Sequence, residues 1–572
     1  MTCSYHNPNK SSMLITNNLS MSSWKDKVAN KRLTCRNAIP MAWKVPQEIL
    51  ANLKTPLETS KNNIIELQLI RRSGVLTEDE LNITESYDVE QLLDALASGR
   101  LTSVDVVTAY SKRAAVSQQL VNCLTETYFD KAIERAKQLD ELRSQGSIVG
   151  PLHGLPISLK DSFQVKSSQA TLGVVSYLDH ISQKNSSLVD MLLSLGAVIY
   201  VKTNVPQTLA TVDTDNNIFG RTLNPWNTKL GAGGSSGGEG ALVALHGSPL
   251  GVGTDVGGSI RIPSLCCGTY SFKPTASRIP YGGQKSCSQA GMDFILPSAG
   301  PLGHDVKSLE VFMKSVIKAG PAVFDSSAIN VPWRSLPTMV KPMLRIGSLP
   351  EDPRFPLHPP VQRVFSEAIR KLQAEGHIVV PLPESECHVS NATETAWKLF
   401  GIDDTAYKHV QAGEEALVPS VLYTHALANN LDYKFIPDLS KLDRLSQLAV
   451  LRTKRAVIVE AWREIWVRNN LDLVISPSAQ STAVEHDRFG LPAYTTLTNV
   501  LDYPSCTIPF LRVDEGDVSK SFQKKPGQTA PEYKPEDVIG APTSIQVFTM
   551  SMKDEECLQF AGIVDQCLQS KV

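Results

Sequence analysis

Three parts of this chain repeat one order of elements, an amphipathic helix followed by an apolar strand. Over 361–375 the apolar residues fall on one helical face, Gly376 supplies a stop, and 377–380 is predicted to form a buried strand. The same order returns at 188–201 and at 456–475. Because such helices and strands must each cover an apolar face, the repeated units predict a β-sheet with helices on both faces, which is an α/β fold.

Composition and charge exclude several classes of function. The 572 residues are 42% apolar and 20% charged, as in soluble globular proteins, and the net charge of −2 gives no reason to expect nucleic acid or an anionic membrane as a partner. No apolar run approaches the roughly 20 residues of a membrane span. The ten cysteines include no CxxC pair, and no histidines have metal-ligand spacing. We therefore expect a cytoplasmic protein with reduced thiols and without a metal or cofactor.

The chain is predicted to consist of a tail, a wrapping segment and one domain. Residues 1–20 are polar where a secretion signal would be apolar, and we expect a disordered tail there. Residues 21–95 are predicted to form a helical segment that wraps around the rest, with Thr77 capping a short helix. Residues 96–572 contain no internal repeat and no long low-complexity linker, so they are predicted to form one domain.

A dense run of glycine and serine covers residues 233–264, with Ser235 and Ser259 separated by 24 positions. A flexible linker is disfavoured because apolar residues flank the run closely, and a phosphate-binding loop is disfavoured because neither GxxxxGK[ST] nor GxGxxG occurs here. The third interpretation is a nucleophile turn whose N–H groups bind an oxyanion. Residues 233–237 match GxSxG formally, but no clear strand leads into them. The spacing alone leaves a catalytic serine open.

Taken with a second segment, GLPISLKD at 154–161, this run resembles the amidase signature family. The family pattern is met from the first Gly-Gly-Ser through to Pro263, and the likeness extends from about Trp24 to Val547. The resemblance implies the amidase signature fold, a large mixed β-sheet covered by helices on both faces, with one catalytic domain at 96–572. It also implies hydrolysis of amides to a carboxylate and ammonia through an acyl-enzyme.

By position, the resemblance assigns a Ser-Ser-Lys triad. Ser259 matches the nucleophile, Ser235 the bridging serine and Lys160 the general base. A lysine can act as a base at neutral pH only if burial lowers its pKa, and Lys160 ends a strand-like stretch that could place it inside the protein. The resemblance further places the oxyanion on the N–H groups of Val256, Gly257, Gly258 and Ser259, with Ser235 also at the substrate.

Other residues near these motifs are given supporting roles. Asp255 and Arg261 are predicted to hold the nucleophile loop without touching the substrate, and Asp161 is predicted to brace Lys160. Leu209 matches an apolar pocket position of the family, although ordinary core packing explains it equally well. The histidines near the motifs are predicted to belong to the scaffold.

Three segments, 203–208, 238–241 and 499–504, resemble eukaryotic acetamidases and fatty-acid amide hydrolases more than bacterial or organellar members of the family. Two others, 150–156 and 24–44, resemble fungal acetamidases most. They favour a small-molecule amide of small or medium size as the only partner, with a homodimer left open. Ser271 and the residues from Phe548 depart from the family pattern, so a specialised amidase of a biosynthetic pathway stays an alternative. Further alternatives are an enzyme like the fatty-acid amide hydrolases, a tRNA-dependent amidotransferase subunit and a non-catalytic scaffold.

Overall fold

The computed structural model describes residues 23–292, 294–337 and 343–570. The predicted tail at 1–20 lies outside the described residues. Within them, a single sheet of eleven strands runs through the molecule in the order β1-β3-β2-β4-β6-β5-β10-β11-β9-β7-β8. The strands are β1 (Leu124–Thr127), β2 (Pro156–Lys160), β3 (Val198–Thr203), β4 (Leu250–Asp255), β5 (Tyr270–Lys273), β6 (Ser298–Gly303), β7 (Arg345–Ser348), β8 (Ile378–Pro381), β9 (Leu473–Pro477), β10 (Ser505–Arg512) and β11 (Pro542–Phe548).

The sheet is mixed, as predicted. β2 runs parallel to both β3 and β4, and β7 runs parallel to β8 and β9. The strands between these two groups pair in antiparallel fashion, and so does β1 at the edge. The central strands are buried along their whole length, as expected for a sheet covered on both sides.

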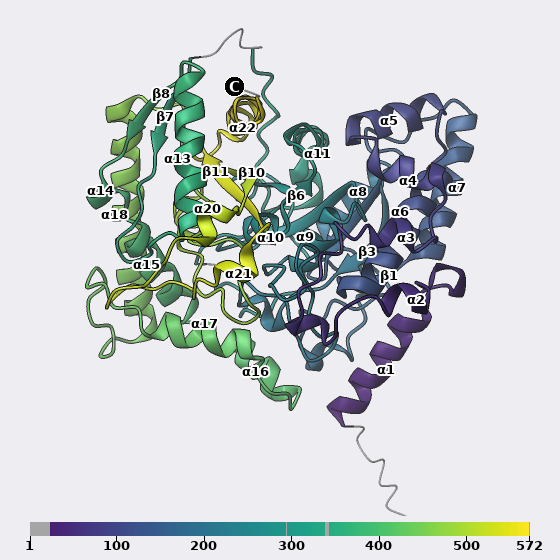
Figure 1. The fold of residues 1–572 in the computed structure, drawn as a ribbon, viewed down its shortest axis with the longest axis horizontal. Helices are drawn as coiled ribbons and strands as arrows, with labels where there is room; N and C mark the ends of the chain where they lie inside the picture. The colour runs from purple at the N-terminus through teal and green to yellow at the C-terminus, as the bar shows by residue number, and fades with distance from the viewer. Residues whose placement is uncertain (1–22, 293, 338–342, 571–572) are drawn as a thin grey trace, which may run out of the picture.

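Helices cover both faces of this sheet (Figure 1). α9 and α10 contact each other, whereas α11, α13 and α22 form a separate packed group. The helices are α1 (Trp24–Asn37), α2 (Gln47–Leu50), α3 (Leu69–Arg72), α4 (Glu78–Glu85), α5 (Val89–Ser98), α6 (Ser103–Val121), α7 (Phe129–Ser144), α8 (Ser187–Ser194), α9 (Gly237–Ala244), α10 (Arg261–Cys267), α11 (Val306–Lys318), α12 (Pro321–Phe324), α13 (Pro359–Ala374), α14 (Glu384–Cys387), α15 (Val389–Phe400), α16 (Thr405–Ala412), α17 (Pro419–Asn429), α18 (Arg444–Asn469), α19 (Ala493–Leu501), α20 (Glu515–Val518), α21 (Pro535–Val538) and α22 (Asp554–Gln569), with short 3-10 turns η1 (Met41–Trp43), η2 (Leu57–Thr59), η3 (Val175–Tyr177) and η4 (Gln207–Leu209).

The three helix–strand units predicted from periodicity are confirmed as α8–β3, α13–β8 and α18–β9. One detail is wrong. The sequence predicts a buried β8, but its residues are exposed or half-buried, because it lies at the end of the sheet and pairs only with β7. An apolar run of four residues does not distinguish a central strand from an edge strand.

The N-terminal segment contributes the helices α1 to α5. Thr77 caps α4 through a capping box, in which the Thr77 hydroxyl accepts from the Glu80 N–H and the Glu80 carboxylate accepts from the Thr77 N–H. α4 packs against α6, α5 against α11, and α1 against β1. Buried residues of the segment join the main core, so it is anchored on the sheet domain at several separate places.

Candidate active site

Lys160 is the last residue of β2 and is fully buried. Its Nζ lies 2.7 Å from Ser235 Oγ, 2.8 Å from Thr254 Oγ1 and 3.3 Å from the Thr254 carbonyl oxygen. All of these partners are uncharged. Burial lowers the pKa of Lys160 from 10.5 to about 7, although the negative charges of Asp255 and Glu239 partly oppose the shift. A large share of Lys160 is therefore neutral near pH 7 and able to accept a proton.

The two serines lie on adjacent loops. Ser235 precedes α9 and Ser259 precedes α10, and the Ser236 N–H donates to the Ser259 carbonyl oxygen at 3.1 Å, which ties the loops together. Ser235 is 2% exposed and Ser259 is 8% exposed, so Ser259 is the most accessible of the three predicted triad residues. The structure joins Lys160 to Ser235, but between the hydroxyl groups of Ser235 and Ser259, both described, it contains no hydrogen bond.

The loop that carries Ser259 turns sharply between β4 and α10. Gly258 has a φ of +129°, and a Cβ at this position would lie 2.3 Å from Thr495 Oγ1. Only glycine fits here, since both the backbone angle and the close approach exclude a side chain. The packing of α19 against this loop therefore depends on Gly258.

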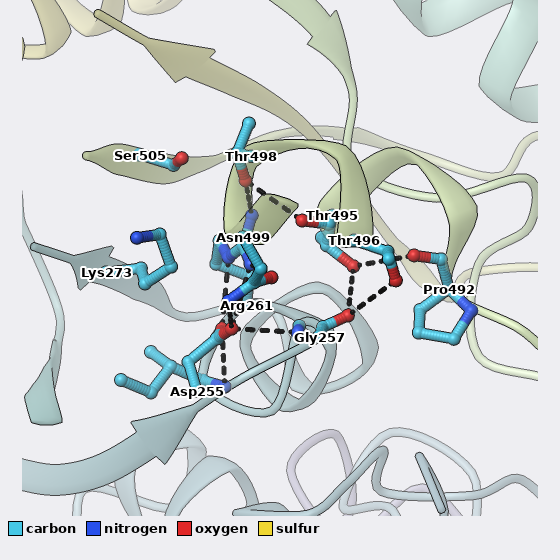
Figure 2. A network of polar contacts seen from close by, with 12 residues as sticks. Asp255, Gly257, Arg261, Lys273, Pro492, Thr495, Thr496, Thr498, Asn499 and Ser505 are labelled. Carbon is cyan, nitrogen blue, oxygen red and sulfur yellow. Dashed lines mark hydrogen bonds and ion pairs between the residues drawn. The ribbon is translucent and has the colours of Figure 1, made fainter. Parts of the chain in front are cut away.

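Asp255 and Arg261 form a buried ion pair at the base of the same loop (Figure 2). The Asp255 carboxylate accepts from the N–H groups of Gly258 and Ile260 at 2.8 and 3.0 Å, and from the Arg261 guanidinium at 2.8 and 3.0 Å. Burial alone would raise the pKa of Asp255, but Arg261 outweighs it and holds that pKa well below its usual range. Asp255 is thus a fixed anion that ties together the start and the end of the loop.

Arg261 extends the network to distant parts of the chain. Its guanidinium donates to Asn499 Oδ1 and Gln546 Oε1, each at 2.6 Å, and also to Thr498 Oγ1. Asn499 in turn donates to Asp255 at 2.9 Å. The Arg261 guanidinium therefore links α19 and β11 to the nucleophile loop. Several charge-assisted hydrogen bonds compensate the burial of its charge.

Two threonines of α19 hold the peptide group between Gly257 and Gly258. The hydroxyl groups of Thr495 and Thr496 donate to the Gly257 carbonyl oxygen at 2.9 and 3.3 Å, while the N–H on the other side of this peptide donates to Asp255 (Figure 2). Both polar ends of the peptide are therefore engaged, and its orientation is determined by its partners rather than by the loop alone.

This arrangement narrows the predicted set of oxyanion donors. The Gly258 N–H binds Asp255, so its predicted role as a donor to the oxyanion does not agree with the structure. The sequence pattern could not show this, because the acceptor depends on how the loop folds back on the end of β4. In the described part of the chain, no acceptor binds the N–H groups of Val256, Gly257 or Ser259.

Asp161 and Leu209 are the two remaining residues that the sequence places near the site. Asp161 does not contact Lys160; it lies 3.2 Å from Lys202 and accepts from the N–H groups of Thr171 and Leu172 at 2.7 and 2.9 Å. Because side chains alternate along a strand, consecutive residues at the end of β2 face different partners. Leu209 packs against a small cluster formed by Leu172, Val174, Tyr177, Cys287 and Val410.

Sequence reasoning misses four residues that shape the site. Thr254 stands directly before Asp255 inside the matched motif, and its position there is the only available signal. Asn499 begins a segment whose resemblance points to one branch of the family and not to a role in the site. Thr495 and Thr496 carry no signal, because nothing in a linear pattern links α19 to a loop more than 200 positions away.

Two kinds of feature are missing from the described residues, a cluster of metal ligands and a membrane-spanning helix. No group of three or more histidine, cysteine, aspartate or glutamate side chains there is arranged to hold a metal ion. Nor does the described chain contain a helix with both the length and the apolar character needed to cross a membrane.

Comparison with known proteins gives consistent matches over nearly the whole chain. A family model described as Amidase matches residues 105–558. An amidase of Gibberella moniliformis is 38% identical over 554 residues, covering 96% of this chain and 99% of that protein. An acetamidase of Aspergillus oryzae is 36% identical over 566 residues, again covering 96% and 99%. The solved structure of a fatty acid amide hydrolase superposes with a TM-score of 0.85 at 28% identity and covers 96% of both chains.

Proposed function

Because this chain belongs to the amidase signature family and is an amide hydrolase, we propose that it cleaves small or medium amides with a Ser-Ser-Lys triad. Ser259 is the nucleophile, Ser235 passes its proton on, and Lys160 is the base. The observation that carries this proposal is the 2.7 Å contact between the Lys160 amine and the Ser235 hydroxyl in a fully buried site without a carboxylate partner for the lysine.

In acylation, two proton transfers accompany formation of the bond from Ser259 to the amide carbon, and the carbon–nitrogen bond then breaks. Neutral Lys160 takes the proton of Ser235, Ser235 takes the proton of Ser259, and Ser259 Oγ bonds to the amide carbon. The N–H groups of Val256, Gly257 and Ser259 stabilise the oxyanion. The lysine proton returns through Ser235 to the departing nitrogen, which leaves as ammonia. A water molecule then repeats the sequence and releases the carboxylate.

The supporting residues keep this geometry in place. Asp255 and Arg261 anchor the loop that bears Ser259, and Thr254 directs the Lys160 amine toward Ser235 by accepting hydrogen bonds from it. The substrate class follows the relatives, since one is an acetamidase and others are named amidases. A subunit of a tRNA-dependent amidotransferase would need its partners for activity, whereas this proposal requires activity of the isolated chain.

Ammonia release by the purified protein tests the proposal. Over a panel of aliphatic, aromatic and long-chain amides, we expect short or aromatic amides to be hydrolysed well and long-chain amides poorly. Ser259→Ala should lower the rate to background, a loss of about 10⁴-fold or more, because no other hydroxyl can form the acyl-enzyme. The fold should persist, since the side chain lost is a small hydroxyl in a polar loop.

A fluorophosphonate probe provides the control. It should label wild-type protein once, on the peptide that contains Ser259, and should not label Ser259→Ala. A label on Ser235 or on a cysteine would contradict the assignment of the nucleophile. Absence of ammonia release from every amide would favour the non-catalytic alternative.

A further inference from the structure

Glu239 is a buried carboxyl group that the mechanism above does not use. It lies on α9, four residues after Ser235, and is fully buried. Among the described residues, no lysine or arginine forms an ion pair with it; its side-chain partners are two hydroxyl groups. A buried carboxyl group without a cation lowers the stability of the fold, so its presence here calls for a physical explanation.

Three neighbouring strands are shaped around this carboxyl group. The hydroxyl of Ser158 on β2 donates to Glu239 Oε2 at 2.5 Å, and the hydroxyl of Thr203 on β3 donates to Oε1 at 2.9 Å. On β4, a Cβ at Gly251 would lie 2.1 Å from Oε2, so only glycine leaves room there. The two hydroxyl donors and the space left by Gly251 together form a pocket that fits the Glu239 carboxyl group.

The same two hydroxyl groups flank the proposed base. Ser158 lies two residues before Lys160 and therefore on the same face of β2, and Thr203 is the residue paired with Lys160 in the parallel ladder. Glu239 and Lys160 thus share one face of the sheet under the start of α9. No hydrogen bond joins them, so a proton cannot pass directly from one to the other.

The remaining ionisable groups around Glu239 are neutral or already paired. Tyr200 on β3 and Cys123 before β1 face it, and burial raises the pKa of both, which keeps them uncharged at neutral pH. Among the other elements packed against α9, α10 contributes Arg261, which pairs with Asp255 of β4, and α6 contributes Arg113, which pairs with Glu85. β3 contributes Lys202, which pairs with Asp161. The charge that lowers the pKa of Glu239 is that of Lys160, and the pKa of Lys160 is raised in turn by the charges of Asp255 and Glu239.

The two groups have overlapping titration ranges. Burial raises the pKa of Glu239 to about 8, partly offset by Ser158, Thr203 and Lys160, and burial lowers the pKa of Lys160 to about 7. Because the charge of each group acts on the other, proton uptake by one changes proton uptake by the other. A negative charge on Glu239 can only raise the proton affinity of the amine.

We propose that Glu239 is a positioning residue that sets the proton affinity of Lys160 electrostatically and stabilises the ammonium form that arises when Lys160 takes up the serine proton. The inference rests on the proposed Ser-Ser-Lys function. With Glu239 protonated, Lys160 is neutral and ready to act as a base. With Glu239 ionised, the protonated lysine of the acyl-transfer step is favoured.

The pH dependence of kcat/KM and kcat for a small amide tests this role. In Glu239→Gln the rising acidic limb should move to lower pH by about half a unit or more, because glutamine cannot ionise. The plateau value of kcat should fall about tenfold, because the ammonium form loses its counter-charge.

Thr203→Val keeps Glu239 but removes one of its hydrogen-bond donors. Glu239 should then hold its proton to higher pH, and the acidic limb should again move to lower pH.

Glu394→Gln is the control at another buried carboxyl, because Glu394 on α15 has no exposed side-chain area but, unlike Glu239, lies 3.8 Å from a lysine, Lys398. The acidic limb of the pH profile of Glu394→Gln should stay at the wild-type pH. If Glu239→Gln lowers activity equally at every pH, the residue is only structural and the inference is wrong. If Glu239→Gln does not fold, an unmoved limb in Thr203→Val likewise shows that the inference is wrong. A limb that survives in Lys160→Met would instead contradict the triad itself.

Discussion

Two parts of the site each bury a basic side chain, but with different partners. Lys160, at the base end, has uncharged partners, whereas Arg261, in the nucleophile loop at residues 255–261, has a carboxylate. Arg261 is enclosed by Asp255 and by neutral oxygen acceptors, and the ion pair keeps the pKa of Asp255 low. Lys160 is equally buried but meets only hydroxyl and carbonyl oxygens, and its pKa falls to about 7. The comparison shows that burial alone does not produce a base.

Lys202 makes the same point from the neighbouring strand. It is as deeply buried as Lys160 but lies 3.2 Å from the Asp161 carboxylate. The Lys202 amine therefore has a carboxylate partner, and the two groups form a buried ion pair. Of these two lysines, Lys160 lacks a carboxylate partner and is therefore the one suited to proton transfer, and the following variants test that distinction.

The largest effect is expected for Lys160→Met. Loss of the base should lower kcat/KM by about 10³-fold or more and remove the acidic limb of the pH profile. Stability should rise, because the fold no longer has to bury a charged lysine at low pH or keep it deprotonated above pH 7. Between pH 7 and 10.5 the unfolded chain binds a proton that the folded chain lacks, so wild-type stability increases with pH over this range. The gain in the variant, on the order of a few kcal/mol, should therefore be greatest below pH 7 and vanish near pH 10.5.

Lys202→Met is the control for this prediction. It leaves the Asp161 carboxylate buried without its cation and should cost about 3–5 kcal/mol. Denaturant unfolding at pH 6 and pH 9 measures the free energy of unfolding of both variants and of the wild type. Equal destabilisation by the two changes would show that the two lysines do not differ in the way described.

Arg261→Met should have the next largest effect, chiefly on stability. Removing the cation leaves the Asp255 carboxylate buried and unpaired, at a cost of about 3–5 kcal/mol near pH 8. The wild-type contribution of Asp255 is present above the unfolded pKa and is lost as the pH falls through its lowered folded pKa. In the variant, Asp255 should take up a proton at higher pH, so the deficit in unfolding free energy should be smaller at pH 5 than at pH 8.

A second substitution checks the cause of that deficit. Asp255→Asn in the Arg261→Met background should recover much of the stability at pH 8 without restoring activity, because the loop amides still lack their anionic acceptor. If stability is not recovered, the loss comes from packing around Arg261 and not from the unpaired charge.

Thr495→Val should have the smallest effect. It removes one of two hydroxyl groups that donate to the Gly257 carbonyl oxygen and should cost about 1 kcal/mol of stability. We expect kcat to fall severalfold with little change in KM, since the hydrogen bond orients the loop without touching the substrate. Combining it with Thr496→Val should lower kcat by more than the product of the single effects, because the carbonyl then has no donor left. Purely multiplicative effects would mean that the two threonines act independently.

Much of the fold follows from local pattern. The helical periodicity over 361–375 predicts α13, and the observed helix is Pro359–Ala374. Thr77 is predicted to cap α4 because threonine accepts a hydrogen bond from a nearby amide within the same few residues, and it does so. The start of α18 at Arg444 is not predicted, since the periodic pattern covers only its second half. The edge position of β8 also depends on strand order, which local pattern does not encode.

The sequence by itself determined which residues are brought forward as the triad, because Lys160, Ser235 and Ser259 lie in two short segments whose order and spacing match a family. It also determined the glycine-lined turn, since the φ of Gly258 is available mainly to glycine. Tertiary structure alone decided the charge state of these groups. The pKa of Lys160 falls because segments from distant parts of the chain exclude water from it and bring no carboxylate into contact with its amine, while Asn499 reaches Asp255 from 244 positions away. A pKa depends on solvent exclusion and on through-space neighbours, and neither is written in the order of residues along the chain.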